Sequence, residues 1–298
     1  MATDPQGDTA QDMPTLKSVL QDSVHGSAWS SLRALDGLRY RAVELAAASA
    51  STDETRREID DLAHKLAVAR PPMVSVGNRV RRFMERAAKV EAGPSESLAD
   101  RLVSLAEELR AEAVERERLA AANAAQLVSG KNVFTLSRSA TVMTALQDAD
   151  PQPSVVVAES LPGGEGRGVA RDLADAGLEV TLVPDAVMAI VLSSDWEPPI
   201  DLVLVGADTV TAEGDVVNKS GTRLAALAAQ AAGVPCYAVL TTDKISRDPQ
   251  AVLDKPTRSA TAPGSRPRTV EPVFELTPRE LMTGLVTEEG IDDASAAS

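Results

Sequence analysis

Apolar residues recur at helical spacing through the first part of the chain. Four segments carry apolar residues three and four positions apart, which is typical of helices with one buried face: 27–48, 53–68, 73–88 and 97–128. The last segment carries a stripe made of Leu98, Leu102, Leu105 and Leu109, with Glu and Arg residues to the outside. We expect these helices to pack on one another through their apolar stripes.

A different pattern begins after residue 131. Short apolar runs of strand length alternate with helical stretches: 132–136, 154–158, 179–183, 201–205 and 235–240. This alternation is typical of βαβ units and a parallel sheet. The fold class is therefore α/β, with a loose tail over residues 1–13, a helical amino-terminal domain over 14–128 and a Rossmann-like parallel-sheet domain over 129–298. Residues 247–268 contain four prolines and no periodicity, which predicts a loop.

The run at 201–205 ends just before an acidic residue, Asp208. Open α/β sheets bind their ligands beyond the carboxyl ends of the strands, so we expect Asp208 to lie at a ligand site. Asn218 and Lys219 precede an Ala- and Leu-rich segment, 221–232, and are expected at the amino end of that helix. Unpaired amides and the helix dipole favour an anion there, and Lys219 adds a formal charge.

Five further residues are candidate ligand contacts: Ser137, Ser139, Gly166, Arg167 and Lys244. Ser137 and Ser139 follow a predicted strand, and they either bind a phosphate at a helix start or cap that helix. Gly166 and Arg167 lie in a glycine-rich segment that either cradles a phosphate or forms a flexible turn, and its spacing matches no phosphate-loop or dinucleotide fingerprint. Lys244 either reaches an anion or forms a solvated pair with its neighbour.

Several motifs resemble a known superfamily. The matching segments, in the order of the chain, are 70–78, 135–142, 158–162, 206–222, 233–238 and 271–278. They are similar to the alpha, beta and delta subunits of translation initiation factor 2B, a superfamily that also contains two sugar-phosphate isomerases, acting on ribose 1,5-bisphosphate and methylthioribose 1-phosphate. The resemblance implies dimerisation through the sheet domain and a polar cleft at the domain junction.

The resemblance also implies roles for individual residues. In the isomerases a Cys and an Asp face the first two carbons of the sugar, and arginines hold the phosphates. Asp208 matches the Asp, whereas Ser137 stands at the position of the Cys. His25 and Leu161 stand where the family has arginines, and His25 and Gly26, which match the family's Arg-Gly motif, are candidate ligand contacts. A free Cys titrates near 8.5, but a Ser acts only beside a base, so Asp208 and Ser137 are doubtful catalysts.

These changes favour an initiation factor 2B-like regulatory or binding protein that retains a phosphosugar or nucleotide pocket at the domain junction. The competing class is an enzyme, a sugar-phosphate aldose-ketose isomerase of the ribose 1,5-bisphosphate type. A third class is a purely structural assembly subunit, in which Asp208, Asn218 and Lys219 would have lost their function. We expect no cofactor and no metal. The expected partners are a phosphorylated small molecule, a homodimer or higher homo-oligomer, and a translation initiation factor as a further candidate.

Another route to chemistry starts from His25. If the amino-terminal loop folds over the sheet as in the relatives, His25 approaches Ser137 and Asp208, and these residue types form a base-assisted hydroxyl site. The alternative is an imidazole at a helix entry that is solvated or binds a phosphate when protonated. The separation of His25 from Ser137 decides between the two.

Composition excludes several classes of protein. The net charge of -14 argues against a nucleic-acid binder, which needs a basic surface. It is compatible with either a high-salt cytoplasm or an ordinary acidic protein. The single cysteine, Cys236, excludes an internal disulfide and a cysteine-based metal site. No signal sequence or bilayer-length apolar run is visible, so we expect a cytoplasmic protein without membrane contact.

Overall fold

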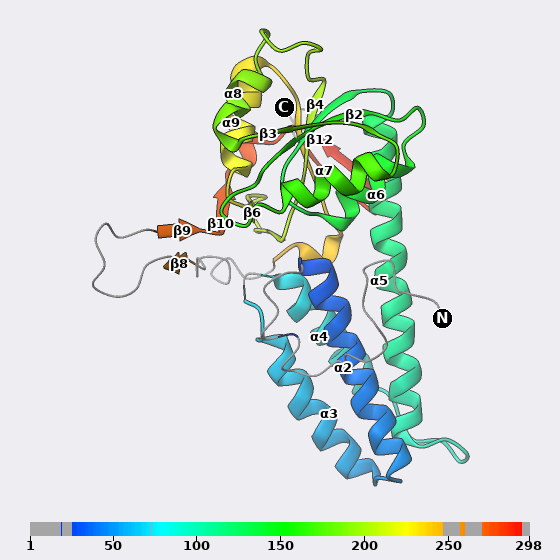
Figure 1. Ribbon diagram of the computed structural model, residues 1–298. Coiled ribbons are helices and arrows are strands. Elements are labelled where there is room, and N and C mark those ends of the chain that lie inside the picture. Colours follow the sequence, from blue (N-terminus) through cyan, green and yellow to red (C-terminus); the bar gives the residue numbers. More distant parts are fainter. Residues whose placement is uncertain (1–18, 20–25, 72, 247–256, 260–269, 294–298) are drawn as a thin grey trace. The chain divides into compact units, whose positions relative to one another are not determined.

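A computed structural model describes residues 19, 26–71, 73–246, 257–259 and 270–293 (Figure 1). The chain divides into two compact units, one ending at Val114 and the other beginning at Glu115. The predicted tail over residues 1–13 and His25 lie outside the described residues. None of the helices in the described ranges combines the length and the apolar character that crossing a bilayer requires.

The first unit consists of helices, as the sequence pattern predicts. They are α2 (Ser27–Ala47), α3 (Thr52–Ala67), α4 (Val74–Ala87) and the first part of α5 (Leu98–Val128). The side chain of Ser51 caps α3 by accepting a hydrogen bond from the amide of Glu54. Leu38, Ile59 and Phe83, one from each of the first three helices, are buried together with the leucine stripe of α5.

Ion pairs hold the start of α5 to its neighbours in this unit. Arg82 and Arg86 of α4 contact Glu112, and Arg86 also contacts Glu108 at 2.7 Å. Arg110 contacts Asp36 of α2 at 3.0 Å. The charged residues outside the leucine stripe are therefore used for packing between helices.

The second unit is built on a seven-stranded sheet in the order β12-β11-β7-β4-β1-β2-β3. Its strands are β1 (Asn132–Thr135), β2 (Ser154–Ala158), β3 (Glu179–Val183), β4 (Leu202–Gly206), β7 (Cys236–Val239), β11 (Gly284–Thr287) and β12 (Gly290–Asp293). All neighbours pair in parallel except β11 and β12, which pair antiparallel. The first five strands lie where the sequence pattern predicts them.

Helices cover both faces of this sheet. The second half of α5, α6 (Ala140–Asp148) and α7 (Gly166–Asp175) pack on one face. The other face carries α8 (Met188–Val191) and α9 (Thr222–Ala232). Val133 and Phe134, neighbours on β1, belong to the two different layers. Both faces of the central strands are buried, which explains their nearly continuous apolar sequences.

The second half of α5 groups with the sheet unit. Ala120, Ala124 and Val128 belong to the core cluster that contains β1 and β2. In the same part of the helix, the side-chain amide of Asn123 donates to the carbonyl of Thr287 at 2.8 Å. The compact units therefore divide within a continuous helix, whereas the sequence pattern places the change at residue 129, where the helical spacing ends.

Smaller sheets lie beside the main one, and the hydrophobic pattern of the sequence did not predict them. One contains β5 (Thr209–Val210), β6 (Val216–Lys219) and β10 (Phe274–Thr277), and another contains β8 (Thr257–Ser259) and β9 (Val270–Pro272). Asn218 and Lys219 are the last two residues of β6, and α9 begins three residues later at Thr222, so they precede the helix as expected but lie on a strand that the sequence pattern did not predict. Single turns of 3₁₀ helix complete the fold: η1 (Asp185–Val187), η2 (Thr242–Lys244) and η3 (Arg279–Leu281).

Candidate functional site

The strand order reverses between β1 and β4. From β1 the chain continues through β2 and β3 to one side, whereas β4, β7 and β11 lie on the other. Ligands of open α/β sheets bind beyond the carboxyl ends of the strands at such a switch point. Ser137 follows β1 and Asp208 follows β4, so two residues selected from the sequence flank this point.

Ser139 links these two strand ends. Its side chain caps α6 by accepting from the amide of Val142 at 3.4 Å. A Cβ atom on Gly206 would lie 2.7 Å from the Cβ and Oγ atoms of Ser139. Gly206 therefore lets the start of α6 approach the end of β4, and the capping role of Ser139 is present in the structure.

Two serines in left-handed backbone conformations shape the turns after β1 and β2. Ser137 has φ 63° and Ser160 has φ 64°. The hydroxyl of Ser160 accepts from the amide of Ser137 at 2.6 Å and donates to the carbonyl of Ala158 at 3.0 Å. The carboxylate of Asp185 accepts from the amides of Ser160 and Leu161, both at 2.7 Å. These bonds fix both turns relative to each other.

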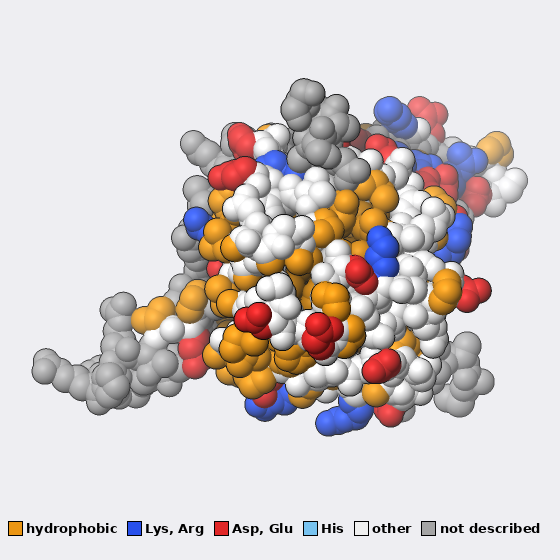
Figure 2. Space-filling model, turned by 90° about the horizontal axis from the view of Figure 1, so that it is seen from above, with side chains coloured by type: hydrophobic (Ala, Val, Ile, Leu, Met, Phe, Trp, Pro, Cys, Tyr) orange, Lys and Arg blue, Asp and Glu red, His pale blue; other side chains and the backbone are white. Residues whose placement is uncertain are grey.

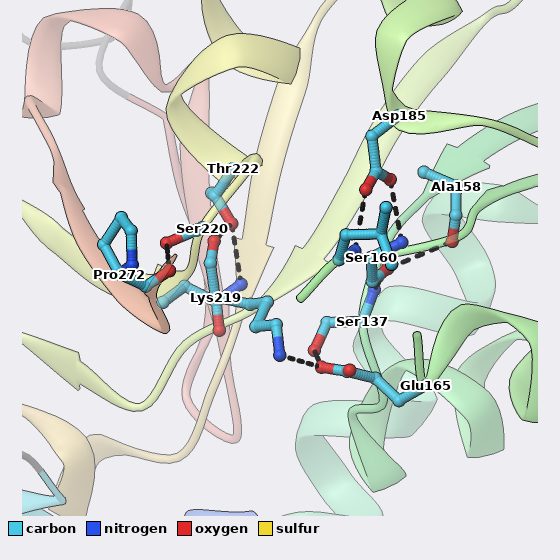
Figure 3. A network of polar contacts seen from close by, with 11 residues as sticks. Ser137, Ala158, Ser160, Glu165, Asp185, Lys219, Ser220, Thr222 and Pro272 are labelled. Carbon is cyan, nitrogen blue, oxygen red and sulfur yellow. Dashed lines mark hydrogen bonds and ion pairs between the residues drawn. The ribbon is translucent and has the colours of Figure 1, made fainter. Parts of the chain in front are cut away.

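Ser137 and Lys219 meet on one carboxylate. The Oε1 atom of Glu165 accepts from the Ser137 hydroxyl at 3.0 Å and from the Lys219 ammonium at 2.7 Å. Figure 3 shows Lys219 extending toward Glu165, with Ser137 on the same carboxylate. The Lys219 side chain is 8% exposed and that of Glu165 is 25% exposed. Glu165 was missed in the sequence because its partners come from two distant segments.

The amino end of α9 is also occupied by a carboxylate of the chain itself. Glu275 Oε1 accepts from the amides of Gly221 and Arg223 at 2.6 and 3.0 Å. The side-chain amide of Asn218 donates to Thr222 Oγ1 at 3.0 Å. The helix start and Lys219, the two anion-binding features expected from the sequence, are thus each paired with a glutamate. Binding of a ligand by Asn218 stays a prediction.

The glycine-rich turn before α7 uses its amides internally. The amides of Gly164, Gly166, Arg167 and Gly168 all donate to backbone carbonyls. A Cβ on Gly166 would lie 1.8 Å from the carbonyl oxygen of Ala158, so this glycine serves close packing. The Arg167 guanidinium pairs with Glu159 at 2.8 Å. A phosphate contact by Gly166 or Arg167 stays a prediction.

Lys244 lies near Asp208 in the chain's fold rather than at the surface. It is 3% exposed, and its ammonium donates to the carbonyl of Ala207 at 2.9 Å. A solvated surface pair with Asp243 is therefore wrong. The amide of Asp208 donates to the carbonyl of Val217 at 3.0 Å, which joins the end of β4 to the small sheet that carries Lys219.

The remaining sequence candidates give a mixed result. Cys236 is 1% exposed, and burial raises the pKa of its thiol to about 12, as expected for a core residue. Gly26 belongs to the first unit, where its carbonyl accepts from the amide of Ser30 at 3.1 Å. Because His25 lies outside the described residues, the proposed site of His25, Ser137 and Asp208 stays a prediction. Within the described ranges no group of three metal-ligating side chains is present.

A sequence model of the Initiation factor 2 subunit family matches residues 23–293. The chain belongs to this family. The resemblance read from the motifs is thereby confirmed, and the match spans both compact units.

Relatives in this family carry different names. The chain is 30% identical over 286 residues to a putative translation initiation factor eIF-2B subunit 2-like protein of Pyrococcus furiosus, covering 93% of this chain and 94% of that protein. It is 33% identical over 259 residues to a methylthioribose-1-phosphate isomerase of Gemmatimonas aurantiaca, covering 80% and 73%. It is 29% identical over 300 residues to a ribose 1,5-bisphosphate isomerase of Haloferax volcanii, covering 95% and 87%.

The fold agrees with that of a solved family structure. The crystal structure of the Pyrococcus horikoshii OT3 translation initiation factor eIF-2B is similar with a TM-score of 0.78 and 27% sequence identity. The similarity covers 95% of this chain and 96% of that one. The predicted class, helical amino-terminal region and Rossmann-like parallel sheet, is therefore confirmed.

Proposed function

We propose that the protein is an initiation factor 2B-like regulatory or binding protein with a pocket for a phosphorylated sugar or nucleotide at the carboxyl ends of the sheet strands. One observation carries this proposal: Ser137 and the buried Lys219 converge on Glu165 beside the switch point of the sheet. A buried ammonium held by a partly exposed carboxylate is costly for stability alone, and ligand binding is a physical reason to retain it.

The same contacts favour binding over catalysis. Ser137 stands where the resemblance places the cysteine of the isomerases, and its hydroxyl donates to Glu165. A serine hydroxyl becomes a reactive nucleophile only when an adjacent general base removes its proton. The only acceptor that the described part of the chain gives this hydroxyl is Glu165, and the same oxygen of Glu165 also accepts from the Lys219 ammonium at 2.7 Å.

An aldose-ketose isomerase of the ribose 1,5-bisphosphate type is the second candidate function. The position of Asp208 just after β4, at the switch point, supports it, because a carboxylate at this edge is placed to act on a bound sugar. The isomerase names among the relatives agree with this candidate.

A thermal-shift screen with sugar phosphates and nucleotides tests the pocket. A ligand that binds only the native state at 100 times its Kd adds about 2.7 kcal/mol of stability. We expect a rise in Tm for the wild type and a loss of that rise in Lys219→Met. The matched control is Lys65→Met, since Lys65 forms an exposed ion pair with Asp61 on α3. An equal rise in Lys219→Met would remove Lys219 from the site.

We also propose self-association through the sheet unit. Figure 2 shows hydrophobic side chains gathered between charged ones on the face seen from above. In the sheet unit, Ile190 of α8 and Leu224 and Leu227 of α9 are 58, 48 and 46% exposed, and α8 packs beside α9. Adjacent exposed apolar side chains are typical of interaction surfaces.

The name of the Pyrococcus furiosus relative makes a translation initiation factor the first protein partner to test.

A further inference from the structure

We propose that Arg116 and Glu117, two consecutive residues of α5, are positioning residues for the candidate ligand site. They hold the loops on both sides of Asp208 and do not contact the ligand themselves. This inference rests on the proposed pocket at the carboxyl ends of the strands, and it names the helix that keeps the loops of that pocket in place. Both residues belong to the sheet unit, which begins at Glu115.

The strand order places Asp208 between two loops. Strand β4, which ends shortly before Asp208, pairs with β1 on one side and with β7 on the other. The loop after β1 leads into α6, and the loop after β7 forms η2. Ligands of such sheets bind at the carboxyl ends of neighbouring strands, so the position of both loops decides how a ligand fits beside Asp208.

Glu117 holds the loop after β1. Its Oε2 atom accepts from the hydroxyl of Thr141, in the first turn of α6, at 2.6 Å. Thr141 is buried, so its hydroxyl has exchanged water for the carboxylate of α5. The same turn of α6 is capped by Ser139. The bond from Glu117 therefore fixes the start of α6 and, through it, the turn that carries Ser137.

Arg116 acts on the loop after β7 through Glu288. The Glu288 carboxylate accepts from the amide and the hydroxyl of Thr242 at 2.9 and 2.6 Å, and the Arg116 guanidinium lies 3.7 Å from it. The Glu288 side chain is only 8% exposed, and a carboxylate that is this buried requires a compensating charge, which Arg116 supplies. Thr242 begins η2, which ends at Lys244, and the Lys244 ammonium donates to the carbonyl of Ala207 at 2.9 Å.

The neighbouring charged residues of α5 make no such contacts and provide a matched control. Glu115 and Arg118 pair with each other at 2.8 Å, and their side chains are 55 and 60% exposed. An exposed pair of this kind contributes little to stability. The same two residue types therefore occur twice within one turn of the helix, once facing solvent and once facing the loops of the site.

Titration calorimetry with ribose 1,5-bisphosphate and with AMP tests the positioning role. We expect Arg116→Met and Glu117→Met each to bind the probe that the wild type binds about 3- to 10-fold more weakly, the factor for about one net hydrogen bond. Glu117→Gln keeps an acceptor for Thr141 and should restore most of the affinity. Glu115→Met and Arg118→Met are the controls and should keep the wild-type affinity.

Amide hydrogen exchange without ligand separates positioning from a general loss of stability. Local opening of a loop raises the exchange of that loop alone. Glu117→Met should raise exchange over residues 138–142, and Arg116→Met should raise it over residues 241–246. Exchange in β2 and β3 should stay at the wild-type rate in both variants, and the Tm of each variant verifies that it is folded.

The outcomes separate this inference from the proposed pocket. Wild-type affinity in both Arg116→Met and Glu117→Met would overturn the positioning role and keep the pocket. Equal weakening by Glu117→Gln and Glu117→Met would overturn it as well, and so would exchange that rises evenly over the sheet. If folded wild-type protein binds neither probe, the proposed pocket fails and the positioning role fails with it.

Discussion

Gly166 is a position where a single methyl group has a large predictable effect. A Cβ there would lie 1.8 Å from the carbonyl oxygen of Ala158, a backbone atom that has no free rotamer. Gly166→Ala should lower the free energy of unfolding by about 3 kcal/mol, the upper end of overpacking effects. Urea denaturation measures this change.

The control for that variant lies two residues along the same helix. A Cβ on Gly168 would meet only the guanidinium end of Arg138, a side-chain atom, at 3.1 Å. Gly168→Ala should be neutral or stabilise by up to about 1 kcal/mol through helix propensity. Equal destabilisation by both variants would show that close packing of Gly166 against Ala158 is not the cause.

Cys236 gives a second prediction for a single side chain. Its thiol is 1% exposed, and burial raises its pKa to about 12, so very little reactive thiolate is present near pH 8. Iodoacetamide should leave the native protein unmodified and should label Cys236 once urea unfolds the chain. Rapid labelling of the folded protein, read by mass spectrometry, would contradict the buried position.

Among single residues, the sequence identified those that belong to recognisable motifs. Asp208 and Ser137 follow strands whose apolar runs are clear, so their place at the strand ends was predictable. Glu165 was not, because its role depends on contacts with Ser137 and Lys219 that only the folded chain creates. The role of Lys244 stayed open between anion binding and a solvated pair, because its burial depends on tertiary packing that the sequence alone does not reveal. The residue is only 3% exposed.

At the level of elements, Asp185 of η1 holds the turn after β2. Its carboxylate accepts from the amides of Ser160 and Leu161, both at 2.7 Å. Asp185→Ala leaves both amides without this charged acceptor and should cost about 1.5 to 3 kcal/mol of stability. Since Ser160 also holds Ser137, the variant should weaken ligand binding as well.

Denaturation and calorimetry of Asp185→Ala test this link between a turn and the site. The control is Asp195→Ala, because Asp195 lies in an exposed segment between α8 and β4. Loss of stability with unchanged ligand affinity would show that the turn supports the fold but not the candidate ligand site around Ser137.

The main helices and strands were predictable because their hydrophobic periods are regular and long. The small sheet of β5, β6 and β10 was not, since its strands have two to four residues and carry no clear alternation. The strand that carries Lys219 was therefore not predicted, although the position of Lys219 just before α9 was. The pairing of Lys219 with Phe274 on β10 is a long-range contact that local pattern does not contain.

At the scale of the whole molecule, the exposed apolar side chains of α8 and α9 predict self-association. Leu227→Arg places a charge among Ile190 and Leu224 and should shift the protein toward the monomer. Light scattering after size exclusion measures the mass. Val43→Arg on α2, where the valine is 41% exposed, is the control and should leave the mass unchanged.

A wild-type protein that is monomeric at every concentration would contradict the proposed self-association. A Leu227→Arg protein with the wild-type mass would contradict it as well.

The family and the α/β class were predictable at this scale, because motifs spread from residue 70 to residue 278 occur in the order of the family. The division of the compact units inside α5 was not, since the helical spacing continues through Val114 without a break.

The central claim is that the protein binds its ligand without isomerase chemistry, and the most direct test uses purified protein with ribose 1,5-bisphosphate. Calorimetry measures the heat of binding, and NMR follows conversion to the ketose. We expect binding with negligible conversion beside an authentic isomerase, because Ser137 stands at the position of the cysteine. Robust turnover that Asp208→Asn abolishes would overturn the proposed binding role and establish the isomerase instead.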